Sequence, residues 1–268
     1  TESERAKEIL SRLYAPFVRQ GNPVIFMDEK SAELTKYAAN AFLATKITFM
    51  NEIANLCELL GADVDMVRKG IGSDSRIGKR FLFPGVGYGG SCFPKDVKAL
   101  NQMAGATGYD FHILQSVMSV NDKQRVILAD KVLQHFGNDI RGKRFAMWGL
   151  SFKPNTDDIR EAPALYIIEK LLAAGATICA FDPEAMPNVQ KQIGDAITYA
   201  QHQYAAVEDA DALIIVTEWS VFRTPDLELL RSKLKNPVVF DGRNVFELDE
   251  MRAAGFVYYS IGREVIRG

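Results

Sequence analysis

The sequence predicts an α/β protein in which a helical block precedes a doubly wound parallel sheet. Residues 31–137 contain long runs of helix-forming residues, whereas from about residue 141 apolar, strand-like segments alternate with helical ones. Strands that alternate with helices indicate βαβ units and a parallel sheet. The length of 268 residues leaves room for two domains, each with its own core.

The first residues do not belong to either block. Residues 1–28 predict a short helix followed by a strand, PVIFMD. We assign residues 1–30 to the tail of an αβ unit whose earlier strands are not in this chain. We therefore expect the working protein to contain a preceding domain.

One long helix opens the helical domain, which we assign to residues 31–137. Ser31 can cap its start and Gly61 can stop it. About 30 helical residues span roughly 45 Å. Such a helix is apolar on most sides and needs partners all round, and a dimer interface is one source of them. A second helical run ends at Gly137.

The remaining residues, 138–268, predict the doubly wound domain. Its strand-like segments are KRFAMWGLSFK, ATICAFDP, ADALIIVTEW, PVVFDGR and FVYYSIGR, with the helix APALYIIEKLLAAG after the first. Ligands of such sheets bind beyond the carboxyl ends of the strands. The positions that we expect there are 149–153, Asp182, 217–219 and 241–243.

The first strand–helix turn departs from a dinucleotide fingerprint. It reads GLSFKP at residues 149–154 and keeps only the first glycine of G-x-G-x-x-G. Asp182 ends the next strand, as in a ribose-binding site, although it is equally consistent with a simple turn. We expect a Rossmann-like domain that binds a nucleotide by another route. Lys153, Arg160 and Arg243 are cations suited to its phosphates.

Polar residues follow one stripe of the long helix. Lys36 and Asn40 are four residues apart and share a face, and Asn51 falls near the same stripe. This stripe could be a solvated face or could line a polar pocket, and the pattern leaves both interpretations open.

The segment GVGYGGSCFPKD combines a glycine-rich loop with a cysteine. Its glycines permit backbone conformations that turn N–H groups toward a ligand. Pro94 suits the first turn of a helix, which puts Cys92 at the helix start, where a thiolate is favoured. Lys95 and Asp96 follow in the first turn. A buried, inert cysteine is the alternative, but the combination favours a reactive one.

Composition excludes several classes of protein. The formal net charge of −2 gives no electrostatic reason to expect nucleic acid or an anionic membrane as a partner. No apolar run approaches the roughly 20 residues of a membrane helix, and the polar start does not resemble a signal peptide. Cys57, Cys92 and Cys179 are too few for a disulfide framework. We expect a cytoplasmic protein without a metal site.

Several motifs, in order along the chain, resemble the nucleotide-sugar dehydrogenases, that is, the UDP-glucose/GDP-mannose dehydrogenase family. They cover essentially the whole chain: ELTKYAANAFLATKITFMNE, DSRIGKRFL, GVGYGGSCFPKD, GLSFKPNTDDIRE, TEWSVFR and FDGRN. The resemblance implies a central helical dimerisation domain followed by a UDP-binding Rossmann-like domain. It also implies an NAD-binding domain before Thr1, without which we expect the isolated chain to be inactive.

The resemblance implies a reaction as well. UDP-glucose is oxidised to UDP-glucuronate, a precursor for polysaccharide biosynthesis, with two NAD⁺. Cys92 matches the nucleophile, which captures the aldehyde as a thiohemiacetal and then carries a thioester. Lys36 and Asn40 match groups that stabilise the oxyanion. Asp96 matches an acid that acts in proton transfer or activates water.

The resemblance also implies binding residues. Those that match the loop around the nucleotide sugar are Phe81, Leu82, Phe83, Pro84, Gly85 and Gly89. Lys153 matches a phosphate contact and Arg243 a further substrate contact. Arg76 matches an arginine that reaches the substrate of the neighbouring subunit in a homodimer. Lys95 and Arg160 match contacts to NAD.

Three alternatives remain. Relatives that act on GDP-mannose or other nucleotide sugars share the cysteine loop, although SCFPKD and EWSVFR resemble the UDP-glucose branch. The isolated chain could instead be a non-catalytic nucleotide-binding and dimerisation module. A cysteine hydrolase is disfavoured because no motif places His112, His135 or His202 beside Cys92.

Overall fold

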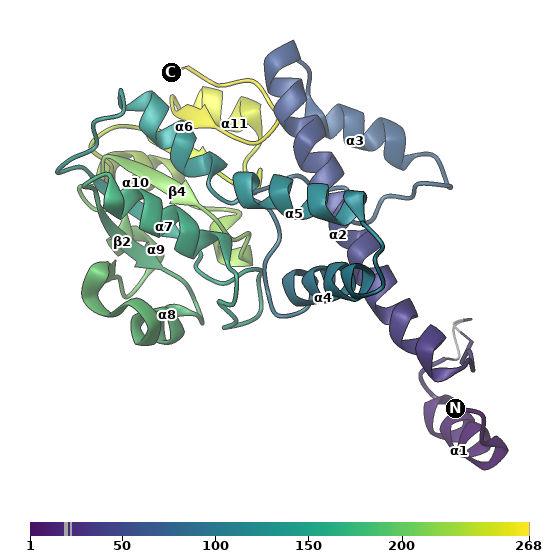
Figure 1. The fold of residues 1–268 in the computed structure, drawn as a ribbon. Coiled ribbons are helices and arrows are strands. Elements are labelled where there is room, and N and C mark those ends of the chain that lie inside the picture. Colours follow the sequence, from purple (N-terminus) through teal and green to yellow (C-terminus); the bar gives the residue numbers. More distant parts are fainter. Residues whose placement is uncertain (19–20, 22, 268) are drawn as a thin grey trace.

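The computed structural model of the protein describes residues 1–18, 21 and 23–267. A separate N-terminal helix leads into a helical region, which is followed by a six-stranded parallel sheet covered by helices (Figure 1). The predicted fold class, a helical region followed by a doubly wound sheet, is confirmed.

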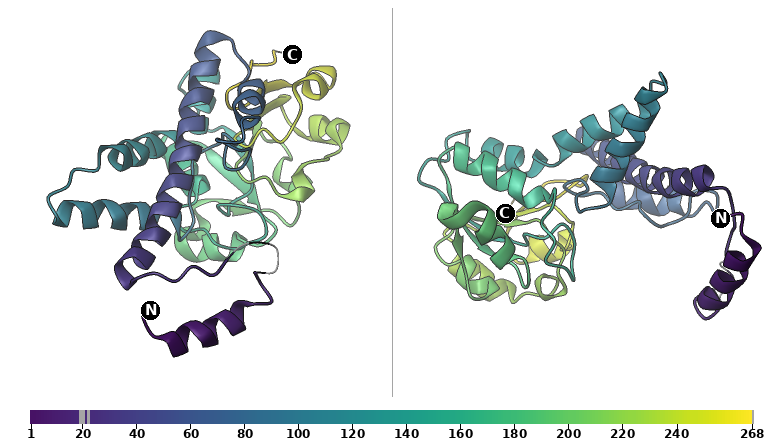
Figure 2. Two further views of the ribbon diagram at one scale, coloured as in Figure 1. Left: turned by 90° about the vertical axis from the view of Figure 1, so that its right-hand side faces the viewer. Right: turned by 60° about the horizontal axis from the view of Figure 1, so that its bottom comes forward.

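The N-terminal segment stands apart from the rest of the molecule (Figures 1 and 2). Helix α1 (Glu4–Tyr14) is capped by the side chain of Ser3 and buries none of its residues. The predicted strand PVIFMD is wrong, since residues 23–28 pair with no strand. A strand needs a neighbour to satisfy its backbone groups, and the sheet found among the described residues begins only at residue 144.

Helix α2 (Glu29–Leu60) is the predicted long helix. Asp28, not Ser31, caps it, because the Asp28 side chain accepts a bond from the Ser31 N–H. The helix ends as predicted at Gly61, whose left-handed conformation lets its N–H bond to the Cys57 carbonyl. Three helices pack against α2: α3 (Val64–Gly72), α4 (Phe93–Ala106) and α5 (His112–Gln124).

One side of α2 is left uncovered. Its buried residues lie toward α3, α4, α5 and the sheet domain, whereas large apolar side chains are exposed elsewhere on the helix. These exposed side chains are Leu34, Phe42, Phe49, Leu56, Leu59 and Leu60. The chain alone therefore does not supply all the partners that this helix needs.

The second helical run is broken. It was predicted to continue to Gly137, but α5 ends at Gln124 and α6 (Ile127–His135) begins after a turn at Arg125. Helix α6 packs on α7 (Pro163–Ala173) and β5 (Val238–Asp241) of the second domain. The turn therefore carries the chain from the helical region onto the sheet.

The sheet has the order β3-β2-β1-β4-β5-β6, and all neighbouring strands are parallel. Its strands are β1 (Arg144–Trp148), β2 (Thr177–Phe181), β3 (Thr198–Tyr199), β4 (Ala212–Ile215), β5 (Val238–Asp241) and β6 (Val257–Tyr259). The sequence missed β3, which at two residues is too short to show a period. The order reverses between β1 and β4, where such sheets bind ligands.

Helices cover both faces of the sheet because the strand side chains alternate between two cores. In β1, Phe145 and Met147 enter one core, whereas Ala146 and Trp148 enter the other. The first core is covered by α6, α7 (Pro163–Ala173) and α8 (Met186–Ile193). The second is covered by α9 (Gln203–Ala206), α10 (Leu227–Lys233) and α11 (Leu248–Ala253). Short 3₁₀ turns occur at Gly194–Ala196 and Ser220–Phe222.

The first of these cores extends into the helical region. Met50 and Ala54 of α2 and Leu82 and Val86 of the following loop belong to the same buried cluster as the sheet. A separate cluster joins the other part of α2 to α4 and α5. The loop before α4 is thus anchored against the sheet domain.

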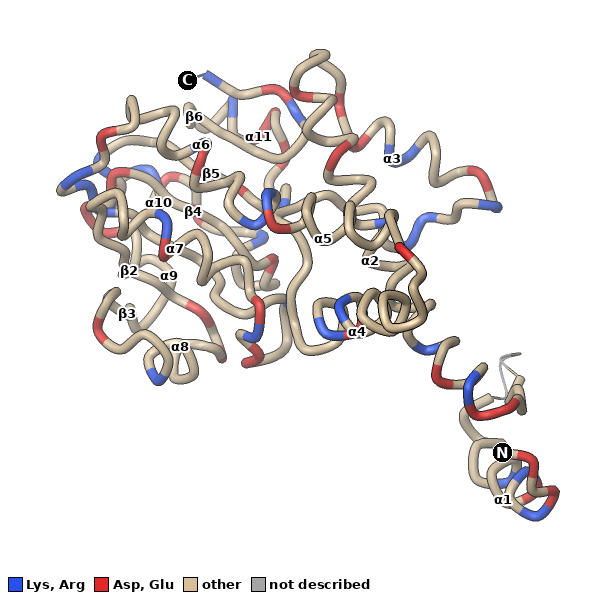
Figure 3. Tube along the Cα trace, viewed as in Figure 1, with Lys and Arg blue, Asp and Glu red and all other residues tan. Residues whose placement is uncertain are grey.

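Charged residues form no dominant patch along the trace. Basic and acidic residues are interspersed along both parts of the trace (Figure 3). Among the described residues, no helix has both the length and the apolar character needed to cross a membrane.

Candidate active site

The loop between α3 and α4 is held by buried amide side chains. Asn51 of α2 accepts a 2.8 Å hydrogen bond from the N–H of Gly85, and Gln124 of α5 donates to its carbonyl at 2.7 Å. Asn121 accepts from the N–H of Tyr88 and donates to its carbonyl. All three side chains are almost fully buried. Asn51, predicted to share a stripe with Lys36, therefore fixes the loop.

The loop also contains the pattern of a dinucleotide-binding motif without its structural context. Gly85, Gly87 and Gly90 match G-x-G-x-x-G, but no strand precedes them and no βαβ unit surrounds them, so the fingerprint lacks its required context. Gly89 and Gly90 make close contacts with another segment of the protein. A Cβ on Gly89 would lie 2.2 Å from the carbonyl oxygen of Glu161, and the N–H of Gly90 donates to the carbonyl of Arg160. These glycines let the two domains approach closely.

Cys92 is the exposed thiol of the chain. It directly precedes α4, which has Pro94 in its first turn, and its carbonyl accepts the N–H of Asp96. Its Sγ lies 3.6 Å from the hydroxyl of Ser91. Cys57 and Cys179 are both buried. Cys92 is therefore not buried, as the alternative interpretation required.

Helix α2 presents two donors to the first turn of α4. The Lys36 ammonium lies 2.5 Å from Oδ2 of Asp96, and the Asn40 amide donates to the same oxygen at 2.6 Å. Asp96 is fully buried, whereas the Lys36 side chain is 52% exposed. The donors that the sequence placed on one stripe thus converge on one carboxylate, which supports the pocket interpretation over the solvated face.

This cluster fixes two charges. Burial by itself would raise the pKa of Asp96, but the hydrogen bonds from Lys36 and Asn40 outweigh it and lower that pKa. The bond to Asp96 raises the pKa of Lys36, and the charge of Cys92 adds to this effect. A carboxylate and an ammonium therefore stand beside the thiol at neutral pH.

One oxygen of this cluster has no hydrogen-bond partner. Oδ1 of Asp96 is buried and has no hydrogen-bond partner in the protein. An ionised carboxylate oxygen only accepts hydrogen bonds. It can therefore take a donor such as a water molecule or a hydroxyl group.

A cavity of about 440 Å³ lies at the predicted edge of the sheet. It brings together five of the predicted binding residues: Phe81, Phe83, Gly89, Lys153 and Arg243. Phe152 and Glu218 also line it, at the strand ends where the sequence predicts ligand-binding positions, and Gly87 lines it from the glycine-rich loop. Sequence reasoning missed the other residues of its lining, which are Ile47, Arg80, Tyr88 and Phe93.

Arg243 is fixed within this cavity. Its Nε donates to the carbonyl of Val216 at 2.8 Å and lies 3.2 Å from the carboxylate of Glu218. Its Nη1 would lie 3.0 Å from a Cβ on Gly85. The guanidinium therefore runs directly beneath the loop.

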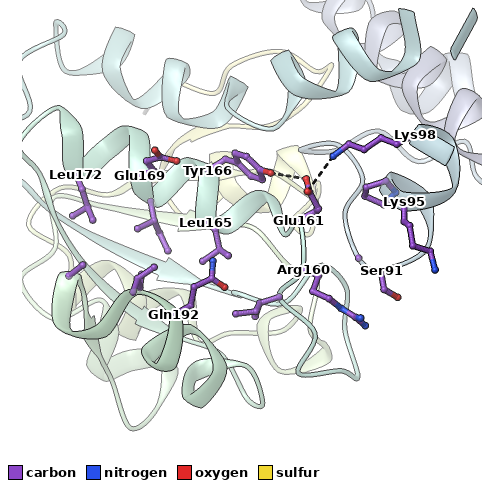
Figure 4. A pocket seen from close by; sticks show the side chains of 16 residues that line it. Ser91, Lys95, Lys98, Arg160, Glu161, Leu165, Tyr166, Glu169, Leu172 and Gln192 are labelled. Atoms are coloured by element: carbon purple, nitrogen blue, oxygen red, sulfur yellow. Dashed lines mark hydrogen bonds and ion pairs between the residues drawn. The ribbon is translucent and has the colours of Figure 1, made fainter. Parts of the chain in front are cut away.

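A second, larger cavity of about 940 Å³ lies between α4, α7 and α8. It contains both residues predicted to contact a dinucleotide, Lys95 and Arg160. In Figure 4 these two cations lie near Ser91 at one end, and Leu165 and Leu172 lie farther along. Arg160 is paired with Asp158, and this pair is the main cause that raises the pKa of Arg160. Cys92 makes a smaller contribution in the same direction.

Cys92 lies on the chain between the linings of these two cavities. Gly89 and Phe93 line the smaller cavity, whereas Ser91 and Lys95 line the larger one. The segment around the thiol therefore contributes residues to both cavities and forms a wall between them, although Cys92 itself is not among the lining residues of either.

Some of the predicted site residues do not place their side chains in these two cavities. Arg76 is exposed, is paired with Asp74 and lines neither cavity. The Leu82 side chain is buried in the core, so that only its backbone can face a ligand. Pro84 lines a third cavity, of about 690 Å³, beside α3.

Asp182 is a structural residue. It is fully buried, and its two oxygens accept bonds from four backbone N–H groups, from the Ser151 hydroxyl and from the Trp219 indole. No oxygen is left to face a ribose. The turn interpretation of Asp182 is therefore correct, and the ribose interpretation is wrong.

Comparison with known proteins agrees with this geometry. Residues 30–123 match the central domain of the UDP-glucose/GDP-mannose dehydrogenase family, and residues 146–248 match its UDP binding domain. The chain is 49% identical over 266 residues to the UDP-glucose 6-dehydrogenase TuaD of Bacillus subtilis, covering 99% of this chain and 57% of that protein. It is 48% identical to a UDP-glucose 6-dehydrogenase of Pseudomonas aeruginosa, covering 97% and 58%.

Solved structures give the same result. A UDP-glucose dehydrogenase from Pyrobaculum islandicum has a TM-score of 0.85 at 34% identity, covering 98% of this chain and 57% of that one. The chain thus spans a little over half the length of these relatives. Because two domains of the UDP-glucose/GDP-mannose dehydrogenase family match residues 30–123 and 146–248, we conclude that the chain belongs to this family and carries its central and UDP-binding domains.

Proposed function

We propose that this chain supplies the cysteine and the nucleotide-sugar site of an NAD-dependent UDP-glucose 6-dehydrogenase. The observation that carries the proposal is the exposed Cys92 on a wall between two cavities, with Lys36 and Asp96 close to it. The names of the relatives favour UDP-glucose as the substrate.

The smaller cavity suits the nucleotide sugar. Lys153 and Arg243 offer positive charge to a diphosphate, and Phe81 and Phe83 offer apolar surface. This cavity adjoins Cys92 through Phe93, so a sugar bound there extends toward the thiol.

The larger cavity suits NAD. Its volume falls within the range of cofactor pockets, and Lys95 and Arg160 would hold the negatively charged part of a dinucleotide at the end near Cys92. When bound, NAD⁺ accepts two electrons in each of the two oxidations.

The residues around the thiol handle the charge that develops on the sugar oxygen. In the first oxidation the C6 alcohol loses its hydroxyl proton and a hydride to become an aldehyde. The Lys36 ammonium and the second N–H of the Asn40 amide stabilise the oxygen as negative charge develops on it.

Cys92 then holds the aldehyde. Its thiolate forms a C–S bond to C6, and the carbonyl oxygen takes up a proton to give a thiohemiacetal. The second oxidation converts this adduct to a thioester. Water attacks the carbonyl carbon and the C–S bond breaks; one proton of the water returns to the sulfur, which regenerates the Cys92 thiol, and the other is lost to solvent as the carboxylate product leaves. Oδ1 of Asp96 accepts a hydrogen bond from that water.

We further propose a homodimer in which α2 is the interface. The exposed apolar side chains of α2 support it. The exposed Arg76, which lines neither cavity of its own chain, would reach the cavity of the partner subunit.

The test is NADH formation by the intact gene product with a panel of nucleotide sugars. We expect two NADH for each UDP-glucose oxidised, and much slower turnover of GDP-mannose and UDP-N-acetyl sugars. Faster turnover of GDP-mannose would contradict the assigned substrate. Binding of UDP-glucose by the intact product without any NADH would favour a non-catalytic binding module.

A further inference from the structure

We propose that Glu161 is a positioning residue that locks the Cys92 loop against the segment carrying Arg160, and so keeps the thiol on the wall between the two cavities. The inference rests on the proposed function, in which Cys92 is the nucleophile. Glu161 lines the larger cavity, but its carboxylate is engaged by Arg125, Tyr166 and Lys98 and is not proposed to touch the substrate, the cofactor or the reacting atoms.

The backbone of Glu161 is held in a strained conformation. Its φ of 52° lies in the left-handed region, which is uncommon for a residue other than glycine. Such strain persists only where the surroundings enforce it. Here they do, because the Glu161 carbonyl fits against Gly89 with no space for a Cβ, and the preceding carbonyl of Arg160 accepts the N–H of Gly90 at 2.8 Å.

The Glu161 side chain joins three helical elements. Its Oε2 accepts a 2.8 Å bond from Arg125, at the end of α5, and a 2.7 Å bond from the hydroxyl of Tyr166 in α7. Its Oε1 lies 3.5 Å from the ammonium of Lys98 in α4. Figure 4 shows the Tyr166 and Lys98 contacts from the two sides of the carboxylate. One residue thus connects both domains.

The Arg125 pair makes this contact hard to replace. Arg125 is only 6% exposed, and its guanidinium also lies over the Tyr166 ring. Burial by itself would raise the pKa of Glu161, but the bonds from Tyr166, Arg125 and Lys98 lower it, so the residue is ionised at neutral pH. Without this charge, a buried cation would lose its main partner.

The loop geometry turns this lock into a functional constraint. Gly89 and Gly90 are followed at once by Ser91 and Cys92, and Arg160 adjoins Glu161 in the chain. A shift of residues 160–161 therefore changes the position of the Cys92 thiol relative to Arg160, which lines the larger cavity. Catalysis is sensitive to shifts of this size.

The test compares the intact gene product with its Glu161→Gln variant, which keeps the shape and removes the charge. We expect kcat to fall about 10- to 100-fold, the size of effect that a small misplacement produces. The KM for UDP-glucose should change little, because Glu161 does not line the smaller cavity. We also expect a changed rate of Cys92 alkylation by iodoacetamide, measured by mass spectrometry at several pH values.

Two further variants make the outcome decisive. Tyr166→Phe removes one donor to Glu161 and should also lower kcat. This variant provides the test if Glu161→Gln fails to fold. Glu228→Gln removes an equivalent charge from the exposed side of α10 and should leave kcat and alkylation unchanged.

The proposal is overturned if folded Glu161→Gln and Tyr166→Phe proteins both keep the wild-type kcat and alkylation rate. The alkylation experiment needs no substrate. If the wild type oxidises no nucleotide sugar, the proposed function fails, while the alkylation comparison still decides whether Glu161 positions the thiol.

Discussion

At the scale of single residues, the site is a balance of charges around one sulfur atom. Lys36 pairs with Asp96 in the first turn of the helix that follows Cys92, and Arg160 lines the larger cavity together with Ser91 and Lys95. Asp96, between Lys36 and Asn40, keeps the cluster from carrying unopposed positive charge. The arrangement favours chemistry in which negative charge appears briefly on sulfur or on a neighbouring oxygen.

The first prediction concerns the nucleophile. Cys92→Ser should reduce formation of the acid product by at least about 10³-fold, because removing a covalent nucleophile has effects of this order or larger. The measurement is UDP-glucuronate formed by the intact gene product. Cys179→Ala removes a buried thiol of β2 and should retain activity. Normal acid production by Cys92→Ser would rule out the covalent mechanism.

The second prediction concerns Lys36. Lys36→Met should lower kcat by about 10²- to 10³-fold, as loss of an oxyanion donor does. The dissociation constant for UDP-glucose should change only a few-fold, since the ammonium acts on charge that develops in the transition state. Lys30→Met, on the exposed first turn of α2, is the control. Lost affinity with normal turnover would contradict the assigned role.

At the scale of elements, the loop before α4 owes its shape to its neighbours more than to its own residues. Amide side chains of α2 and α5 fix it from one side. The backbone of residues 160–161 fixes it from the other side. Close packing therefore requires these glycines. The number of glycines alone had predicted contacts with a ligand instead.

The third prediction tests this packing. Gly89→Ala should destabilise the protein by about 1–3 kcal/mol, the usual cost of overpacking a tight interior, because its Cβ would collide with the Glu161 carbonyl. Gly105→Ala should instead stabilise α4 by about 0.5 kcal/mol, since nothing lies within 4 Å of the added carbon. Chemical denaturation measures both. Equal stability of the two variants would exclude the tight contact at Gly89.

The fourth prediction concerns the packing of α6 on the sheet. His135 bonds to the Tyr259 hydroxyl at 2.9 Å and packs edge-on against Phe136, Phe240 and Tyr259. Burial lowers the pKa of His135 below its ordinary value of 6.5. Below about pH 6.5 the unfolded chain therefore binds more protons than the folded one, and stability falls as the pH falls.

We expect NMR titration to give His135 a pKa below 6.5. The free energy of unfolding should decrease between pH 7.5 and 5.5, and His135→Gln should flatten this decrease. A His135 pKa at or above 6.5 would contradict the buried environment.

At the scale of the whole molecule, the long helix α2 organises both the site and its surroundings. It supplies Lys36 and Asn40 to the site, Asn51 to the loop and Met50 to the core shared with the sheet. Its remaining apolar side chains face solvent in the single chain. Covering them is the main stabilisation that the chain alone does not provide.

The fifth prediction tests the proposed dimer. Phe49→Glu, at a side chain that is 54% exposed on α2, should convert a dimer to a monomer because a charge would be buried in an apolar interface. Light scattering during size-exclusion chromatography measures the mass. Val221→Glu introduces the same charge at an exposed apolar residue of the sheet domain and should leave the dimer intact. A wild-type monomer would disprove the proposed interface.

Features with local causes were predictable from the sequence. Gly61 ends α2 and Pro94 starts α4 because each acts within one turn of backbone. The alternation of strands and helices likewise predicted the doubly wound sheet. The place of Cys92 directly before α4 was predictable for the same local reason.

Features that depend on distant partners were not predictable in the same way. PVIFMD has the composition of a strand but no neighbour to pair with. Asp182 has the position of a ribose ligand, but its oxygens are taken by groups of two other segments. Glu161 looks like an ordinary loop residue until the fold brings Gly89 and Arg125 to it.

The wall that carries Cys92 also restricts how this sequence can change. Gly89 and Phe93 line one cavity, whereas Gly90, Ser91, Pro94 and Lys95 line the other. Inserting or deleting one residue here would turn the following side chains toward the wrong ligand, even if every residue type were kept. The spacing of this segment is therefore constrained as strictly as its composition, and in evolution gaps here should be as rare as replacements of Gly89 or Cys92.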